Sequence, residues 1–386
     1  MTAMMWSRES RMSSAEIPIA DVERFGDIER KHRLVTEFLE SHAYEGLLLC
    51  KPSNFAWFTS GGDSSRAGSS ERTAAVFITP EARVVAAGSI DAAQLFEQQL
   101  AGLGFQLKER PWHEPRNLLL EDLSRGRRVA GDLPAPRIQD VSVHLTGMRI
   151  PLTALECERL RKVGALVAHA VEATARHVSP GMTESEVAGE LSHRLIKHEA
   201  VPERLQVFAD GRAGKYPHWT YGEHPVEQWC TIAAVARKWG LCAAASRTIA
   251  FGRPSQEVVD AHHCASLVQA SGMFFSQPEW ELAEVWNRAQ RIYEKYGYPH
   301  EWQHAEQAEI IGYETCEVPV VPRSEFRLAP RMALHWHPSV GPAFVGDTVL
   351  VGDDGHETLT PMENWPRLQL ELKGQTLTRP AILRRE

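Results

Sequence analysis

The segment Thr231–Thr248 constrains the fold of this chain more than any other stretch. It reads Thr-Ile-Ala-Ala-Val-Ala-Arg-Lys-Trp-Gly-Leu-Cys-Ala-Ala-Ala-Ser-Arg-Thr, with apolar runs on both sides of Arg237–Trp239 and Gly240. Two such runs around a glycine-containing turn are typical of a β-hairpin. We therefore expect two short strands joined at Gly240.

Length, composition and charge narrow the class of protein. A chain of 386 residues predicts two domains, because a single core seldom grows that large. The hydrophobic fraction of 43% and the charged fraction of 24% are those of an ordinary soluble protein. A net charge of −8 argues against nucleic acid as an obligate partner. No apolar run approaches the ~20 residues that cross a bilayer, so we expect no membrane partner. The partner expected from the site residues considered below is a small-molecule substrate.

The N-terminus and the cysteines predict a cytoplasmic location. Met1–Ser14 has no continuous apolar stretch of the kind found in secretion signals, and we expect a frayed leader there. The cysteines are scattered and form no Cys-x-x-Cys pair; they are Cys50, Cys157, Cys230, Cys242, Cys264 and Cys316. Such a pattern is typical of reduced thiols, most of them buried.

The first half of the chain alternates predicted helices and strands. A helix is expected over Asp27–Glu40, and the apolar run Gly46–Cys50 predicts a buried strand. Two more strands are expected at Ala74–Thr79 and Arg83–Ala87. This alternation predicts an α/β domain over residues 15–150, ending in a linker around Asp140–Pro151.

The second half, residues 151–386, begins with helices and ends with strands. A long amphipathic helix stops before Ser179, and Thr183-Glu-Ser-Glu186 predicts a capping box for the next helix. Strand signals dominate from Met332 onward. Helices and strands in separate runs are typical of an α+β domain.

Short motifs occur in one order along nearly the whole chain. They are Asn54–Gly61, Ser179–Glu184, Pro217-His218, Gly240–Thr248, Ile310–Pro319, His337-Pro338 and Gly355–Thr360. In order and spacing they resemble the creatinase/prolidase branch of the pita-bread hydrolases, which includes aminopeptidase P. The resemblance implies an α/β N-terminal domain of the creatinase type, an α+β pita-bread C-terminal domain and a homodimer.

The resemblance also implies a pair of metal ions held by two Asp, one His and two Glu. Carried over by position, these ligands fall on Ala233, Ala244, Glu309, His337 and Gly346. None is retained in kind, and a methyl group cannot coordinate a cation. We therefore predict no metal of the family type, and no nucleotide cofactor, because glycine-rich nucleotide motifs are absent from the sequence.

The polar residues at the altered positions favour a metal-independent hydrolase or lyase that acts on a C–N or related bond of a small amino-acid-like or amide compound. His218 falls on the family's loop histidine and is expected to transfer the proton. Glu309 and His337 stand at former ligand positions, where a carboxylate beside an imidazole makes an acid–base pair.

Five further residues are expected to contact the substrate: Trp219, Arg247, Tyr313, Cys316 and His335. His335 lies two residues before His337, so a strand would present both on one side. Arg247 is expected to hold a substrate carboxylate in a bidentate fork. Cys316 falls on the family's second histidine, where a nucleophilic thiol is conceivable.

Two other interpretations stay open. In the first, His335, His337 and Glu309, with His218 or Cys316, hold one Zn or Fe ion in a rebuilt site of an Xaa-Pro-peptidase-like enzyme. In the second, the chain is a pseudoenzyme or binding protein with a pocket and no turnover, because loss of the ligands is also what inactivation produces.

Overall fold

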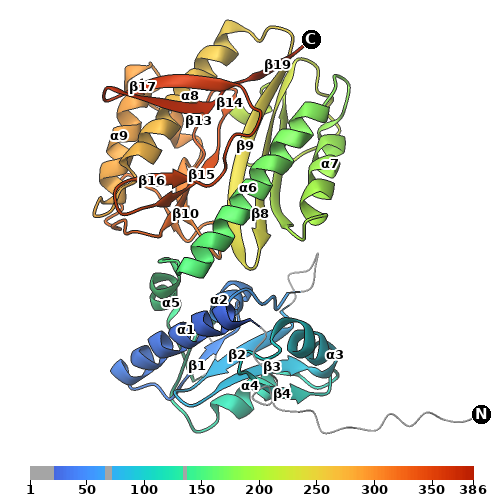
Figure 1. The fold of residues 1–386 in the computed structure, drawn as a ribbon, viewed down its shortest axis with the longest axis vertical. Coiled ribbons are helices and arrows are strands. Elements are labelled where there is room, and N and C mark those ends of the chain that lie inside the picture. The colour runs from blue at the N-terminus through green and yellow to red at the C-terminus, as the bar shows by residue number, and fades with distance from the viewer. Residues whose placement is uncertain (1–20, 66–71, 134–136) are drawn as a thin grey trace, which may run out of the picture. The chain divides into compact units, whose positions relative to one another are not determined.

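The computed structural model describes residues 21–65, 72–133 and 137–386. Contacts divide the chain into two compact units between Arg149 and Ile150, and each unit is described by itself (Figure 1). The expected leader, Met1–Ser14, lies outside the described residues. No helix in the described ranges has both the length and the apolar character needed to cross a bilayer.

The first unit is built on a six-stranded mixed sheet with the strand order β4-β3-β2-β1-β5-β6. The pairs β1–β2 and β2–β3 are antiparallel and the other three pairs are parallel. Its strands are β1 (Gly46–Leu49), β2 (Ala74–Ile78), β3 (Arg83–Gly88), β4 (Gln106–Arg110), β5 (Val129–Gly131) and β6 (Ile138–Asp140). The predicted α/β class of this half is confirmed.

Helices pack against this sheet through apolar side chains. They are α1 (Val22–Ser41), α2 (Pro52–Phe58), α3 (Ser89–Ala93) with its π-helical continuation η2 (Gln94–Gln99), α4 (Arg116–Ser124) and α5 (Ser142–Arg149). Leu119 and Leu123 of α4 pack on Leu48 and Phe77 of the sheet. Helix α1 contacts β1 and α2.

Asn54 joins α2 to the end of the first unit. Its Nδ2 donates to Asp132 at 2.9 Å, and its Oδ1 accepts from the guanidinium group of Arg149. Arg149 is buried and belongs to α5. The two units divide inside the expected boundary segment Asp140–Pro151, but most of that segment is the helix α5, held to the first unit, rather than an extended linker.

The second unit contains two larger sheets. One has the order β19-β9-β8-β7, the other has the order β11-β10-β12-β15-β16, and β9 contacts β15 between them. Their strands are β7 (Val201–Ala209), β8 (Trp229–Lys238), β9 (Leu241–Phe251), β10 (Ala308–Ile311), β11 (Val318–Pro319), β12 (Ala333–Trp336), β15 (Asp347–Val351), β16 (His356–Thr358) and β19 (Leu383–Arg385). Two small hairpins are added, β13 (Ser339–Val340) with β14 (Ala343–Phe344), and β17 (Arg367–Leu372) with β18 (Gln375–Pro380).

Two pairs of helices cover these sheets. Helix α6 (Ala154–His177) packs on β8 and β9 and α7 (Glu184–Ile196) on β7, as Figure 1 shows. Helices α8 (Gln256–Phe275) and α9 (Leu282–Lys295) pack on each other, and α8 also contacts β12 and β17. Two short 3-10 segments are η3 (Arg212–Gly214) and η4 (Glu301–Gln303). The predicted capping box is confirmed: Thr183 N donates to Glu186 Oε2 at 2.8 Å, and Glu186 N donates to Thr183 Oγ1 at 3.2 Å.

Strands β8 and β9 form the predicted hairpin, but with 10 and 11 residues they are long rather than short. Arg237, expected in the turn, lies within β8 and pairs with Cys242. The turn consists of Trp239 and Gly240, whose φ angles are 53° and 80°. Two consecutive positive φ values define the type I′ turn that suits the twist of a hairpin.

The register of the hairpin decides which side chains share a face. Ala233 lies opposite Ser246, and Val235 lies opposite Ala244. Because successive side chains in a strand alternate between faces, Ala233, Ala244 and Ser246 lie on one face and Arg247 lies on the other. The face with Ala233 is the one turned toward the cavity described below.

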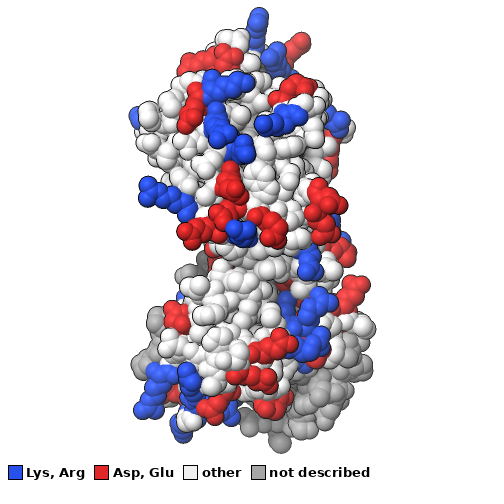
Figure 2. Space-filling view, turned by 90° about the vertical axis from the view of Figure 1, so that its left-hand side faces the viewer, with Lys and Arg blue, Asp and Glu red and all other residues white. Residues whose placement is uncertain are grey.

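Charged side chains of both signs are interspersed on the face drawn in Figure 2. Lys and Arg side chains alternate there with Asp and Glu side chains over the described residues. Such a mixed surface is typical of soluble domains. The expectation that nucleic acid is not a partner stays a prediction.

Candidate active site

Glu309 holds two imidazoles in the second unit. Its Oε1 lies 2.8 Å from Nδ1 of His335, and its Oε2 lies 2.5 Å from Nε2 of His337. All three side chains are buried, and the two rings stack with centroids 4.4 Å apart. We call these residues the Glu309 triad.

Strand pairing explains why these side chains meet. Glu309 in β10 lies directly opposite His335 in β12. His337 comes directly after β12 and two residues after His335, so its side chain returns to the same face as that of His335. The expectation that both histidines lie on one side of the strand agrees with this geometry.

The charges in the triad follow from these contacts. Burial alone would raise the pKa of Glu309, but the charges and hydrogen bonds of His337 and His335 lower it overall, so the carboxyl group is ionised. Burial, assisted by His337, lowers the pKa of His335 and favours its neutral form. Since a carboxylate only accepts hydrogen bonds, the protons lie on Nδ1 of His335 and on Nε2 of His337.

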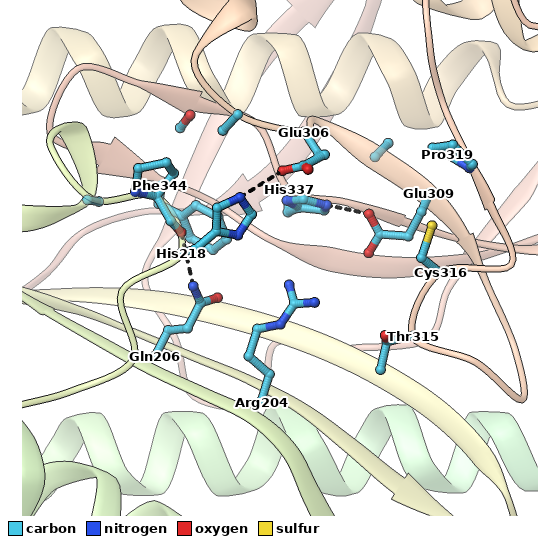
Figure 3. Close-up of a pocket in the computed structure, with 15 residues that line it drawn as sticks. Arg204, Gln206, His218, Glu306, Glu309, Thr315, Cys316, Pro319, His337 and Phe344 are labelled. Atoms are coloured by element: carbon cyan, nitrogen blue, oxygen red, sulfur yellow. Dashed lines mark hydrogen bonds and ion pairs between the residues drawn. The ribbon is translucent and has the colours of Figure 1, made fainter. Parts of the chain in front are cut away.

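A cavity of about 130 Å³ opens beside the triad. Its wall includes Arg204, Gln206, His218, Glu309, Cys316 and His337, which Figure 3 shows around one space. The structure thus brings together His218, Glu309 and His337, the three residues expected to be catalytic. His335 does not line the cavity and supports Glu309 from behind, so its predicted contact with substrate is corrected to a positioning role.

His218 lies at the mouth of the cavity. Its Nε2 is 3.3 Å from Oε2 of Glu306, and the two side chains are 69% and 62% exposed. An exposed pair of this kind contributes little to stability, so the position of His218 depends on its loop. Gln206 holds that loop, because its Nε2 donates to the backbone oxygens of Pro217 and Trp219, each at 3.1 Å.

All six cysteines lie in the described ranges and are free thiols. Cys316 is exposed, and the other five are buried. It lines the cavity, as expected. Burial raises the pKa of its thiol to about 11, and the charge of Glu309 adds to this rise. The thiol is therefore protonated at neutral pH, which does not favour its role as a nucleophile.

Arg247 does not reach the cavity. Its side chain is completely buried and forms ion pairs with Glu172 of α6 at 3.1 Å and with Asp347 of β15 at 2.9 Å. It also donates to the backbone oxygens of Ser246 and Thr360. The prediction that Arg247 binds a substrate carboxylate is corrected, because strand alternation turns it toward α6 and its donors are already used.

Tyr313 and Trp219 are also corrected. Tyr313 is buried outside the cavity wall, and its hydroxyl donates to Oε1 of Glu156 at 2.6 Å. Trp219 donates its Nε1 proton to Glu184 at 2.8 Å and packs on Phe344 and Ala233 behind the wall. Both residues support the site rather than line it.

Sequence reasoning missed Arg204, Gln206 and Glu306. Arg204 and Gln206 lie in β7 opposite Val235 and Ala233, on the same face as the cavity. In the sequence, Arg204 and Gln206 alternate with Leu205 and Val207. This pattern could have indicated the site, because polar side chains at every second position of a buried strand form a polar face. Glu306 carried no comparable signal.

The comparisons with known proteins agree with this architecture. The model of metallopeptidase family M24 matches residues 158–353, just over half of the chain. The chain belongs to metallopeptidase family M24. An uncharacterized peptidase of Staphylococcus aureus is 23% identical over 257 residues, which cover 62% of this chain and 71% of that protein.

Solved structures show the fold of the family along most of the chain. The prolidase from Pyrococcus horikoshii OT3 has a TM-score of 0.75 at 18% identity, covering 86% of this chain and 99% of that chain. The Xaa-Pro dipeptidase from Bacillus anthracis has a TM-score of 0.72 at 19% identity, covering 87% and 98%. The expected combination of an N-terminal domain with a pita-bread domain is thereby confirmed.

The two metal ions that the M24 family implies do not fit the residues present. The positions carried over as Asp hold Ala233 and Ala244, whose methyl groups offer no ligand atom. A β-carbon at Gly346 would lie 3.2 Å from Nε2 of His335 and 3.4 Å from Oγ of Ser246. His335 therefore occupies space that a longer side chain at position 346 would need. The reaction proposed below uses no metal pair.

Proposed function

We propose that this M24 member is a metal-independent hydrolase or lyase that breaks a C–N or related bond in a small amino-acid-like or amide compound. The observation that carries the proposal is the contact of the ionised Glu309 with His337 in the wall of one cavity, while His335 holds Glu309 from outside that wall. A carboxylate beside an imidazole fixes its tautomer and orientation. His337 would then act as an acid–base group whose Nδ1 is free to exchange a proton.

Two His–Glu pairs on one cavity support chemistry that moves two protons. His337 with Glu309 would take a proton from water or from the substrate, and His218 with Glu306 would supply one to the departing nitrogen. In a hydrolysis, water adds to the carbon as the C–N bond breaks and the nitrogen leaves protonated. In an elimination, the same base would remove a proton from carbon instead.

A screen of amides, amidines and ureas, read out by released ammonia or amine, tests this proposal. With a substrate in hand, Glu309→Gln, His337→Asn and His218→Asn are each expected to lower kcat/KM by about 10²–10⁴-fold, the usual contribution of a positioned acid–base group. Variants that turn over substrate at the wild-type rate would contradict the assigned roles. Ligand binding without turnover by the wild type would support the pseudoenzyme interpretation.

His169→Asn is the matched control for His218→Asn. His169 of α6 and Glu363 form a second exposed His–Glu pair outside the cavity wall, with a distance of 3.0 Å and exposures of 55% and 45%. Both variants remove a similar surface contact. Only the change at His218 is expected to affect turnover.

A single bound metal ion is the second candidate, because ligand atoms of Glu309, His335 and His337 all lie within 4.8 Å of one another. Two His and one carboxylate match the donor set of one Zn or Fe ion. The hydrogen bonds described above use one nitrogen of each imidazole, so an ion held by those same nitrogens would replace them. Metal analysis, described in the Discussion, separates the two candidates.

The assembly and the location of the protein are two further proposals. We propose a homodimer, as the family resemblance implies, and light scattering that gives a monomer mass would contradict it. The free state of all six cysteines supports a reducing compartment such as the cytoplasm.

A further inference from the structure

Arg204 places a positive charge in the cavity with no neutralising partner. Its guanidinium group forms no ion pair and no hydrogen bond with any residue in the described ranges. It lies in β7, on the face of the sheet that carries Ala233, and Figure 3 shows it directed into the space between His218, Glu309 and Thr315. A partly buried arginine without a partner retains all five donors for a ligand.

The two acidic side chains of the cavity wall, Glu306 and Glu309, already have partners. Both oxygens of Glu309 accept hydrogen bonds from the triad histidines. Glu306 pairs with His218 across the mouth of the cavity. Among the described residues that line the cavity, Arg204 is therefore the cation without a partner. An incoming anion would complete its hydrogen bonding.

The size and charge of the cavity restrict that anion. About 130 Å³ admits only a few heavy atoms. Glu309 and Glu306 would repel a dianion such as phosphate more strongly than a singly charged group. A carboxylate carries one charge and matches the planar fork of a guanidinium group with two parallel hydrogen bonds.

A second cavity of about 330 Å³ adjoins the first and shares His218, Glu306 and Pro319 with it. Its wall includes Trp286 and Trp302, whose rings meet edge to face at 5.4 Å. Val320, Val321 and Pro322 add to its apolar part, while Gln303, His304 and Gln307 contribute polar atoms. Aromatic walls of this kind favour a flat apolar group.

We propose that Arg204 binds the carboxylate of the substrate and that the neighbouring tryptophan cavity receives an apolar, preferably aromatic, group at the other end. The proposal rests on the proposed function, for which it names the substrate class: small monocarboxylates that carry an aromatic substituent. Arg204 takes the role that the sequence had suggested for Arg247.

Calorimetric titration with 3-phenylpropionate and its neutral isostere 3-phenylpropanamide tests the carboxylate. The wild type is expected to bind the acid about tenfold or more tightly than the amide, a factor of ten being 1.4 kcal/mol. Arg204→Gln should remove this preference, and Arg204→Lys should keep part of it, because the charge remains and the fork is lost. Arg327→Gln is the control, since it removes an equal charge from a side chain that is 62% exposed and outside both cavities.

Trp302→Ala tests the aromatic end. It should weaken binding of 3-phenylpropionate about tenfold and leave binding of propionate unchanged, because propionate has no group for the second cavity. Equal affinity of the wild type for the acid and the amide, or an unchanged preference in Arg204→Gln, would overturn the role of Arg204. Tighter binding of inorganic phosphate than of either acid would overturn the choice of a monocarboxylate.

Binding and turnover separate this proposal from the proposed function. If Arg204→Gln keeps the preference while Glu309→Gln abolishes turnover, the substrate class is wrong and the catalytic proposal stands. If the preference depends on Arg204 but turnover survives in Glu309→Gln, the substrate class stands and the catalytic proposal is wrong. Circular dichroism of each variant verifies that it is folded, and the comparison of acid and amide on the wild type needs no variant.

Discussion

Arg247 of β9 and Glu172 of α6 form an ion pair, with Nε 3.1 Å from Oε1, in which both side chains are completely buried. Asp347 of β15 joins them at 2.9 Å from Nη1 of Arg247. This cluster links the hairpin sheet, the long helix and the second sheet of the pita-bread unit. Because Arg247 points into this buried cluster, it stabilises the fold and does not contact the cavity.

Replacing Arg247 by Leu is expected to lower the free energy of unfolding by about 3–5 kcal/mol, because Glu172 and Asp347 would lose the buried counter-charge between them. Of their described ion-pair partners, Glu172 would keep Arg176 at 3.0 Å, and Asp347 would keep Arg379 at 3.7 Å. Urea unfolding followed by circular dichroism measures this change. Arg161→Gln is the control, since the Arg161–Glu357 pair is about half exposed and should change stability by less than about 1 kcal/mol. A stable Arg247→Leu protein that has lost only ligand binding would instead support the prediction that Arg247 binds a substrate carboxylate.

Gly346→Ala is expected to disturb the Glu309 triad. The new methyl group would lie 3.2 Å from Nε2 of His335 and 3.6 Å from Cβ of His337, so the imidazole must shift or the strand must move. Overpacking of this kind costs about 1–3 kcal/mol, and a larger relative loss is expected in turnover than in stability.

Gly189→Ala provides the comparison for this substitution. A β-carbon at Gly189 meets no atom within 4 Å, and the residue lies in the exposed part of α7. Alanine there should stabilise the protein by about 0.5–1 kcal/mol. If both variants behave alike, the space beside Gly346 is larger than the structure indicates.

Alkylation of Cys316 should report the charge of the cavity. Because burial raises the pKa of its thiol to about 11, with Glu309 adding to the rise, reaction with iodoacetamide should be slow at pH 7. The rate should increase about tenfold per pH unit below that pKa, since the thiolate is the nucleophile. Because the pKa of the thiol is raised, the neutral and unreactive form persists until the pH approaches 11.

Glu309→Gln removes one of the charges that raise the pKa of Cys316, so the variant should react faster at a given pH. Mass spectrometry of tryptic peptides identifies the modified cysteine. Cys316→Ser should lose the reaction, because the other five thiols are buried. Fast alkylation of Cys316 at pH 7 in the wild type would mean that its thiol is more acidic than its surroundings imply.

Metal content decides between the two candidate functions. For a metal-independent enzyme, elemental analysis of the purified protein should find less than stoichiometric Zn, Fe, Mn or Co. Turnover should survive dialysis against a chelator such as 1,10-phenanthroline. One equivalent of a transition metal, lost in both His335→Gln and His337→Gln, would instead assign the Glu309 triad as a rebuilt single-ion site.

The sequence alone determined the features that depend on local pattern. The turn at Gly240, the capping box of Thr183 with Glu186, and the order of strands and helices follow from backbone preference and periodicity. The approach of His335 and His337 to Glu309 was also foreseeable, because strand alternation places both histidines on one side. The sequence also shows that Ala233 and Ala244 offer no side-chain ligand atoms for a family-type metal pair, and the absence of that pair stays a prediction.

Only the tertiary structure decided which charged side chains are free. Arg247 and Arg204 look alike in the sequence, but one meets Glu172 and Asp347 in the interior and the other faces a cavity without a partner. Tyr313 is likewise withdrawn from the site by Glu156, which lies 157 residues earlier in the chain. The partner of a charge or hydroxyl comes from an element far away in sequence, and pairing across that distance is set by packing rather than by any local pattern.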